Sequence, residues 1–323
     1  MNILILSAGI RNKIVQYFKE TLGNDGQVFA TDMSEFAPAV YEADKFFKVP
    51  PVMEENYIDS LLLICRREKV DGIVSLMDDD LSLLAKNREQ FQKVGTTVIG
   101  SSLELCERSI DKWEMYCWLK ENKYKTAESY IDLGLFIKDY QKGKIDFPVF
   151  VKPTCGGGSQ SIAKVNDLKT LQQIFEKAQE QLMIQQFMDG CEIGADVYID
   201  ILSKEVVSIF TKEKLVMRSG ETNKSVSIKD PALFALIEDF VLKSGYLGQI
   251  DIDVFRVDGE YYISEVNPRF GGGYPHAYEC GCNHMKCIIN NLNGIANEKC
   301  IGNYDENYYM MKYNEVMIRK IEK

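Results

Sequence analysis

The stretch that decides the fold is Gln249-Ile-Asp-Ile-Asp253-Val-Phe-Arg-Val-Asp-Gly259-Glu-Tyr-Tyr-Ile-Ser-Glu265-Val-Asn267-Pro-Arg269. Apolar and polar residues alternate on both sides of Asp258-Gly259, which predicts two strands joined by a tight turn. The alternation places Asp253, Glu265 and Asn267 on one face of this hairpin. Asp251 lies on the same face and is an alternative to Asp253 as the first member of the group.

Two carboxylates and an amide oxygen form an oxygen-only donor set. Such a set suits Mg²⁺ shared with the phosphates of a nucleotide better than it suits zinc or copper. Arg269 follows two residues after Asn267, and its fork of donors can bind a phosphate or a carboxylate beside the metal. An amphipathic hairpin with a solvated acidic face is the alternative interpretation, so the assignment depends on the motifs upstream.

Length and charge limit the classes of function. A chain of 323 residues is long enough for two or three lobes around an enzyme cleft. The net charge of −10 opposes nonspecific attraction to nucleic acid or to anionic membranes, so we expect neither partner. The N-terminus lacks the features of a signal peptide, and nine cysteines, an odd number, fit reduced thiols. These observations predict a cytoplasmic protein.

The first hundred residues alternate strands and helices, which predicts a small parallel sheet covered by helices. The loop after the first strand, Ser7-Ala-Gly9-Ile-Arg-Asn, lacks the G-x-G-x-x-G fingerprint of dinucleotide-binding proteins, which argues against an oxidoreductase. Asp78, Asp79 and Asp80 follow the fourth strand. They stand at the carboxyl end of that strand, where ligands of open α/β sheets usually bind. We favour the alternative that one of them caps the next helix and the others face water. Helical periodicity then runs from 103 to 122.

A glycine-rich turn between two apolar strands is the second strong signal. Gly156-Gly-Gly-Ser159 can form a nest of backbone amides that approaches an anion closely. Lys152 ends the preceding strand, and a lysine there requires an anionic partner. The alternative interpretation is a flexible hairpin tip without a ligand.

The order of these motifs resembles the ATP-grasp superfamily, in particular ligases similar to the ATP-binding halves of carbamoyl-phosphate synthase and to biotin carboxylase. The matching segments are Asp111-Lys112, Val151-Lys152-Pro-x-x-Gly-Gly-Gly-Ser, Gln185-Gln-Phe-x-x-Gly-x-Glu192 and Asp253-x(11)-Glu265-Val-Asn-Pro-Arg269. The resemblance covers residues 1 to 292. It implies an α/β chain with a Rossmann-like pre-ATP-grasp domain at 1–100, an ATP-grasp domain at 101–295 with a lid at about 120–187, and a C-terminal tail at 296–323 packed on the ATP-grasp domain.

The resemblance also implies roles for individual residues. Those that bind ATP are Lys112 and Lys152 on the phosphates, Gly156, Gly157, Gly158 and Ser159 in the lid loop, Gln185, Gln186 and Phe187 at the adenine hinge, and Glu192 on the ribose. Asp253, Glu265 and Asn267 bind the metal, and Arg269 holds the transferred phosphoryl group or the substrate carboxylate. The chain departs from the family pattern at Thr154, Cys155 and Ser161 in the lid loop, and at the glutamines of the hinge.

The predicted function is ligation of a carboxylate to an amine through an acyl phosphate, with release of ADP and phosphate. The cofactors are ATP and Mg²⁺, with Mn²⁺ as an alternative, and the partners are small-molecule carboxylates and amines. Arg269, Arg218 and His276 are the catalytic candidates. The alternatives are carbamoyl-phosphate-synthase-like or carboxylase chemistry through carboxyphosphate, and a subunit that binds ATP without turnover. Resemblance to such ligases also implies a homodimer.

Overall fold

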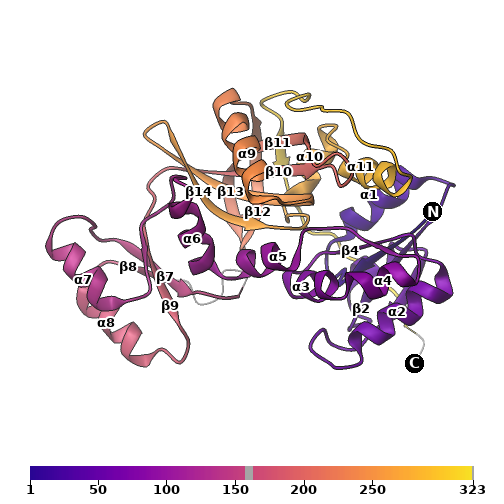
Figure 1. The fold of residues 1–323 in the computed structure, drawn as a ribbon, viewed down its shortest axis with the longest axis horizontal. Coiled ribbons are helices and arrows are strands. Elements are labelled where there is room, and N and C mark those ends of the chain that lie inside the picture. The colour runs from indigo at the N-terminus through magenta and orange to yellow at the C-terminus, as the bar shows by residue number, and fades with distance from the viewer. Residues whose placement is uncertain (157–162, 322–323) are drawn as a thin grey trace.

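The computed structural model describes residues 1–156 and 163–321. The chain forms three sheets, and Figure 1 shows the smallest of them with α7 and α8 at one end of the molecule. The parallel sheet of the N-terminal region lies at the other end, and the largest sheet lies between them. None of the helices in the described ranges combines the length and the apolar character needed to cross a membrane. The predicted mixed α/β class is confirmed.

The N-terminal sheet has five parallel strands in the order β3-β2-β1-β4-β5. These strands are β1 (Asn2–Leu6), β2 (Gln27–Asp32), β3 (Lys45–Lys48), β4 (Gly72–Ser75) and β5 (Thr97–Val98). The accompanying helices are α1 (Asn12–Leu22), the 3₁₀ helix η1 (Pro38–Tyr41), α2 (Tyr57–Glu68), α3 (Asp78–Lys86) and α4 (Arg88–Lys93). Both faces of the strands are apolar, which is the pattern of a sheet buried on two sides.

The smallest sheet belongs to the predicted lid region and is antiparallel, with the order β6-β9-β7-β8. Its strands are β6 (Ser129–Tyr130), β7 (Val149–Pro153), β8 (Ala163–Val165) and β9 (Leu182–Gln186), and its helices are α7 (Leu133–Gln141) and α8 (Leu168–Lys177). These elements enclose a separate apolar cluster that includes Phe136, Val151, Leu171 and Ile184. Because it has its own core, this region can keep its shape while its position relative to the rest changes.

The largest sheet is antiparallel, with the order β14-β13-β10-β11-β12-β15. Its strands are β10 (Cys191–Ile199), β11 (Val206–Arg218), β12 (Glu221–Ile228), β13 (Gly248–Val257), β14 (Glu260–Asn267) and β15 (Tyr309–Met311). The predicted hairpin is confirmed as β13 and β14. Asp258 and Gly259 both have positive φ, at 50° and 80°, as a tight two-residue hairpin turn requires.

Helices cover the two faces of this sheet. They are α5 (Leu103–Ile110), α6 (Lys112–Glu121), α9 (Pro231–Ser244), α10 (Tyr274–Glu279) and α11 (His284–Leu292). One apolar cluster joins the inward residues of β10 and β13 to Phe240 of α9. Another cluster extends from the N-terminal sheet to α10 and α11, where Tyr17 of α1 stacks on Tyr278. This second cluster fixes the N-terminal region against the large sheet.

The turn after β10 depends on one buried carboxylate. Asp200 accepts hydrogen bonds from the backbone amides of Leu202, Ser203 and Asn297 and from the side-chain amides of Asn291 and Asn297, all at 2.7–2.9 Å. Burial alone raises the pKa of this carboxyl group, but these hydrogen bonds prevail and lower it to about 2. Asp200 therefore links the large sheet to α11 and the segment that follows it.

We expect Asp200→Ala to lower the free energy of unfolding by about 2–3 kcal/mol at pH 7, because several charge-assisted hydrogen bonds are lost. The folded pKa is below the unfolded value of 3.8, so this contribution is present above pH 4 and is lost as the pH falls toward 2. Urea unfolding at pH 7 and at pH 3 measures both effects. Asp25→Ala, at an exposed position, is the control. Equal stability of the two variants would contradict the prediction.

Candidate functional site

A cavity of about 800 Å³ gathers side chains from the lid, from the large sheet and from the loop after β1. Arg11 comes from the N-terminal region, and Lys152 and Gln185 come from the lid. The hairpin β13–β14 supplies acidic residues. The lining also includes Lys112, Gly156, Glu192, Lys214, Glu221, Asp251, Asp253, Glu265, Asn267, Arg269, Gly272 and Gly273. Most of the residues predicted from the sequence therefore meet in one place.

The register of the large sheet creates the polar face of this cavity. Asp253 lies opposite Glu265, and Asp251 lies opposite Asn267. On the other side of β13, Asp253 is opposite Gly194 and Asp251 is opposite Asp196. Residues directly opposite in a ladder share a face, so these carboxylates are forced to one side of the sheet while the alternate apolar residues enter the core.

The residues predicted as metal ligands line the cavity, and each already has a polar neighbour. Lys214 Nζ lies 2.5 Å from Asp253 Oδ1, and Arg269 Nη2 donates to Asn267 Oδ1 at 3.1 Å. Within residues 1–156 and 163–321, no three His, Cys, Asp or Glu side chains form a metal-binding group by themselves. Mg²⁺ is commonly held by one or two carboxylates together with substrate phosphates, so this oxygen-only set fits it.

Asp251 differs from Asp253 in its electrostatic surroundings. Burial and the nearby carboxylates of Asp253 and Asp196 raise the pKa of Asp251 to about 7, although Lys212 and Lys214 act in the opposite direction. These surroundings favour the protonated form of Asp251 more than water does. Gly271 packs directly over it, because an added Cβ would lie 2.4 Å from the Asp251 carboxylate.

The two predicted phosphate-binding lysines line the cavity from different elements. Lys112 begins α6, and Asp111 caps that helix by accepting from the amides of Trp113 and Glu114. The predicted continuous helix is therefore wrong, because this cap separates α5 from α6. Lys112 Nζ donates to the carbonyl of Gly156. Burial lowers the pKa of Lys152 on β7, while Glu265 acts to raise it.

Some of the residues predicted to contact the ribose and the adenine line the cavity, and others do not. Glu192 lines the cavity, and its carboxylate lies 2.8 Å from Lys214 Nζ. Gln185 is also in the lining, whereas the described lining contains neither Gln186 nor Phe187. The Gln186 amide donates to the Glu128 carbonyl, and Phe187 packs against Phe150. Gly157, Gly158 and Ser159 lie outside the described residues.

Two of the catalytic candidates, Arg218 and His276, are absent from the described lining of the cavity. Arg218 is exposed at the end of β11. His276 is only 4% exposed, and its ring is held between the Ser225 hydroxyl and the Tyr308 carbonyl. A carbonyl only accepts, so Nε2 of His276 carries the hydrogen and Nδ1 accepts from Ser225. Burial, followed by Lys212, lowers the pKa of His276 to about 4.

Among the charged residues that sequence reasoning did not assign to the site are Arg11, Lys214 and Glu221, which line the cavity, and Asp78, which pairs with Arg269. The expectation that the aspartates after β4 cap a helix or face water is wrong for two of them. Asp78 pairs with Arg269, with Nη2 donating to Oδ2 at 3.0 Å. Asp80 is buried and accepts from the hydroxyls of Ser7, Tyr57 and Ser75. The usable signal was the position of Asp78 at the carboxyl end of a parallel strand, where ligands of such sheets bind.

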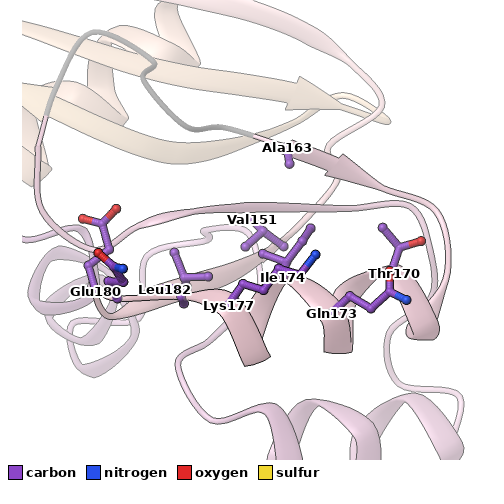
Figure 2. Close-up of a pocket in the computed structure, with 10 residues that line it drawn as sticks. Val151, Ala163, Thr170, Gln173, Ile174, Lys177, Glu180 and Leu182 are labelled. Atoms are coloured by element: carbon purple, nitrogen blue, oxygen red, sulfur yellow. The ribbon is translucent and has the colours of Figure 1, made fainter.

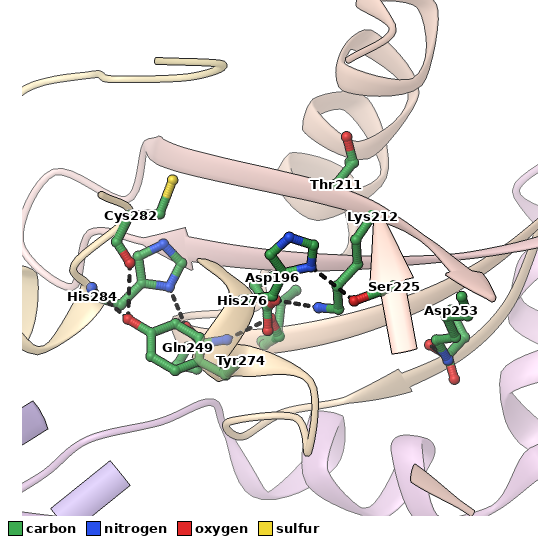
Figure 3. Close-up of polar contacts among 12 residues, drawn as sticks. Asp196, Thr211, Lys212, Ser225, Gln249, Asp253, Tyr274, His276, Cys282 and His284 are labelled. Atoms are coloured by element: carbon green, nitrogen blue, oxygen red, sulfur yellow. Dashed lines mark hydrogen bonds and ion pairs between the residues drawn. The ribbon is translucent and has the colours of Figure 1, made fainter. Parts of the chain in front are cut away.

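A buried polar network supports the floor of the cavity (Figure 3). Lys212 pairs with Asp196 on the neighbouring strand, and both side chains are almost completely buried. His284 lies between the amide oxygen of Gln249 and the hydroxyl of Ser208. Because the amide oxygen only accepts, Nδ1 of His284 donates to it and Nε2 accepts from Ser208. Burial, followed by Lys212, lowers the pKa of His284 to about 3, so this ring is neutral in the folded chain.

A smaller cavity of about 440 Å³ lies in the lid (Figure 2). It is lined by Val151, Thr170, Ile174, Lys177, Glu180 and Leu182 among others. Its described lining contains none of the residues predicted from the sequence, so the larger cavity is the candidate active site.

Family models match two segments of the chain. The model described as "PylC-like, N-terminal domain" matches residues 3–99, and the model described as "ATP-grasp domain" matches residues 109–273. A curated carbamoyl-phosphate synthase of Methanobrevibacter smithii is 24% identical, over 96% of this chain and 85% of the relative. A carbamoyl phosphate synthase large chain from a Thermoanaerobacter species is 25% identical over 81% of this chain. The chain spans about a quarter of the length of that large chain, since the match covers 24% of it.

Solved structures share the fold at low sequence identity. The N5-carboxyaminoimidazole synthetase of Staphylococcus aureus, complexed with ADP, has a TM-score of 0.73 at 17% identity, covering 92% of this chain and 78% of that one. The biotin carboxylase domain dimer of Hydrogenobacter thermophilus 2-oxoglutarate carboxylase, in complex with MgADP, ADP and bicarbonate, has a TM-score of 0.74 at 17% identity. That match covers 95% of this chain and 73% of the other.

We expect the two histidines to make stability depend on pH, because both rings are neutral when folded and titrate near 6.5 when unfolded. The contribution of the two neutral rings to the free energy of unfolding is fully present above pH 6.5 and is lost as the pH falls toward 4. Each buried ring lowers the free energy of unfolding by about 1.4 kcal/mol per pH unit in that window. His284→Gln loses hydrogen bonds at pH 7.5, but its deficit relative to wild type narrows below pH 6.5.

Urea unfolding at pH 7.5, 6.0 and 5.0 measures this narrowing. The chain has only two histidines, so the double variant His276→Gln with His284→Gln removes all histidine-linked pH dependence and is the control. A deficit for His284→Gln that stays constant over the three pH values would refute the neutral, buried assignment.

Proposed function

This chain belongs to the ATP-grasp family, and we propose that it is an ATP-dependent ligase that joins a carboxylate to an amine through an acyl phosphate. The recognition of the family from its motifs is confirmed, as are the fold class and ATP with Mg²⁺ as the cofactors. The observation that carries the proposal is the meeting of Lys112, Lys152 and Arg269 with the carboxylates of one hairpin in a single cavity.

Phosphoryl transfer requires charge neutralisation more than covalent chemistry from the protein. Lys112 and Lys152 supply positive charge from α6 and β7, on the side of the cavity that the lid forms. Mg²⁺ would be held by Asp253, Glu265 and Asn267, and when bound it neutralises charge on the phosphates and orients them. Lys214 must then leave Asp253 or share it, because its ammonium now pairs with that carboxylate.

Arg269 is positioned to hold the reacting carboxylate or the transferred phosphoryl group. Its guanidinium is anchored by Asp78 and Asn267, so its direction is fixed before a ligand arrives. A fixed donor lowers the reorganisation needed in the transition state. An acyl phosphate must also be kept from water. The lid region has its own core and supplies one wall of the cavity, so its closure would exclude water.

Carboxyphosphate chemistry is the second candidate, because the curated relatives are carbamoyl phosphate synthases by name. The same lysines, arginine and metal would support it, with bicarbonate in place of an organic carboxylate.

The similar biotin carboxylase domain of Hydrogenobacter thermophilus is described as a dimer, which supports a homodimer for this chain. The proposed substrates are small-molecule carboxylates and amines, and the proposed location is the cytoplasm.

We expect Glu265→Ala to reduce ADP formation about 100-fold or more, because a charge that holds the metal and phosphates is removed. Steady-state ADP release with Mg-ATP measures this loss. Glu260→Ala, on the same strand but absent from the described lining of the cavity, is the matched control. Circular dichroism shows whether both variants are folded. Turnover by folded Glu265→Ala at the rate of the control would refute the metal assignment.

Hydroxylamine traps an acyl phosphate whatever the natural amine is. We therefore expect hydroxamate formation with Mg-ATP and at least one member of a panel of amino acids and other carboxylic acids. Bicarbonate is included, and its stimulation of ADP release without any hydroxamate would favour the carboxyphosphate alternative. If no panel member gives hydroxamate or stimulates ADP release while ATP binds, the ligase proposal fails.

A further inference from the structure

The exposed large apolar side chains of the N-terminal region gather at one edge of its sheet. Parallel strands end at the same edge, and four of the five strands are followed there by a loop that carries such a side chain. Leu63 on α2 is the one other large apolar side chain of residues 1–100 with comparable exposure. We call this set the apolar rim, and its members, which are 46–81% exposed, are Ile10 after β1, Met33 and Phe36 after β2, Met53 after β3 and Met77 after β4.

Two carboxylates hold the loops of the apolar rim together. Asp32 accepts from a backbone amide of the loop after β1 and from one of the loop after β2, both at 2.9 Å. Asp80, which follows β4, accepts from the hydroxyls of Ser7 and Tyr57, both at 2.7 Å. Ser7 belongs to the loop after β1, and Tyr57 ends the loop after β3. The rim is therefore held in one arrangement before a ligand binds, which lowers the cost of ordering it.

The apolar rim adjoins the cavity at two points. Ile10 directly precedes Arg11, which lines the cavity. Met77 directly precedes Asp78, and Oδ2 of Asp78 accepts from Nη2 of Arg269 at 3.0 Å. The carboxyl edge of an open parallel sheet is also where ligands usually bind. A substrate whose carboxylate reacts at Arg269 therefore extends from a point beside the rim.

The C-terminal segment 312–319 is held beside the same edge at both of its ends. Lys312 Nζ lies 3.0 Å from Glu221 Oε2, and the other oxygen of that carboxylate lies 2.9 Å from Arg11 Nη2. The guanidinium of Arg319 lies 5.7 Å from the ring centroid of Tyr41, and the Tyr41 hydroxyl donates at 2.8 Å to a carbonyl of the loop after β2. One end of the segment therefore lies next to the loop of Ile10, and the other next to the loop of Phe36.

Between these two contacts, the C-terminal segment exposes apolar side chains of its own. Tyr313, Val316 and Ile318 are 81–87% exposed. The segment and the apolar rim thus bring two sets of exposed apolar residues, far apart in the sequence, to the same end of the cavity. A concentration of exposed apolar surface marks a binding site, because such surface gains free energy when another apolar group removes it from water.

The charged groups at this end already have partners. Arg11 and Lys312 share Glu221, and Arg269 pairs with Asp78, all within 3.0 Å. Arg269 also accounts for the reacting carboxylate of a substrate. The part of the surface that lacks a partner is therefore apolar, and a ligand gains affinity there through apolar contacts rather than through a second charge.

We infer that the carboxylate substrate of this chain carries an apolar group, and that this group binds on the apolar rim beside Ile10 and Met77 while its carboxylate reacts at Arg269. The C-terminal segment covers the same group. The inference rests on the proposed ligase function and names the class of its substrate, which is an acid with an apolar chain. A second copy of this chain is a different occupant, and the experiments distinguish it from a substrate.

The first test uses acids in pairs of similar size, one apolar and one polar: leucine and asparagine, norleucine and lysine, hexanoate and 6-aminohexanoate. Hydroxamate formation and ADP release with Mg-ATP are measured with the full chain. For at least one pair, wild type is expected to use the apolar member with a kcat/KM at least about tenfold higher, because each buried methylene contributes about a fourfold gain. Equal use, or preference for the polar member, in every pair that reacts would overturn the inference.

Variants of the surface test its residues directly. Ile10→Ser and Met77→Ser are each expected to raise KM for the preferred acid about 3- to 10-fold, with little change in KM for ATP. Tyr313→Ser is expected to raise the same KM about 2- to 5-fold. Leu63→Ser removes an exposed apolar side chain from α2 and is the control. All four positions are exposed, so we expect the variants to fold. An unchanged KM in the first three variants would contradict the inference.

Equilibrium dialysis gives a readout that does not need turnover. The same pairs of acids are dialysed, with MgADP present, against wild type and against the double variant Ile10→Ser with Met77→Ser. Tighter binding of an apolar member to wild type than to the double variant supports the inference even if no hydroxamate forms, in which case the ligase proposal fails separately. Equal binding to both proteins, or to neither, overturns the inference.

Sedimentation velocity separates a substrate from a second copy of the chain as the occupant of the apolar rim. If the rim binds substrate, the double variant Ile10→Ser with Met77→Ser is expected to have the same oligomeric state as wild type. A wild-type dimer that dissociates in the double variant would make the rim an interface between copies, and the inference would then be wrong.

Discussion

The cross-strand register of β13 and β14 is the constraint on which the site depends. A turn at Asp258-Gly259 sets Asp253 opposite Glu265 and Asp251 opposite Asn267. A shift by one residue would turn these carboxylates into the core and the apolar residues of the same strands into the cavity. The burial of Ile250, Ile252 and Val254 therefore keeps the acidic residues of β13 on the cavity side. The same alternation of apolar and acidic residues thus stabilises the sheet and forms the site.

Charges concentrated on one face of a sheet need partners of opposite charge. Four pairs or groups provide them: Lys212 with Asp196, Lys214 with Glu192 and Asp253, Arg269 with Asp78, and Arg11 with Glu221. Leaving any of these charges buried and unpartnered would cost several kcal/mol. A ligand that binds to one of these side chains would replace its present partner, and its affinity would reflect the difference between the new contacts and the old ones.

The pairs differ in how readily they can exchange. Lys212 and Asp196 are almost fully buried beneath the cavity floor, among the neutral rings of His276 and His284 (Figure 3), and they act as a fixed support. Lys214 and Arg11 line the cavity itself, so a ligand can reach their carboxylate partners. The fold therefore keeps rigid pairs below the cavity and exchangeable pairs at its wall. The N-terminal region contributes to the wall because apolar contacts, including the Tyr17–Tyr278 stack, lock α1 against α10.

The sequence by itself determined the elements that follow local rules. Period-two alternation and the Asp-Gly turn predicted the hairpin and its acidic face, and the alternation of strands with helices predicted the parallel sheet. It could not determine which charged residues meet, because Arg11, Asp78, Glu221 and Lys312 are far apart along the chain and belong to no local pattern. Only the tertiary structure decided those pairings, together with the burial of His276 and the exposure of Arg218. The physical reason is that pleat and turn geometry act over a few residues, whereas charge pairing depends on how separate sheets pack.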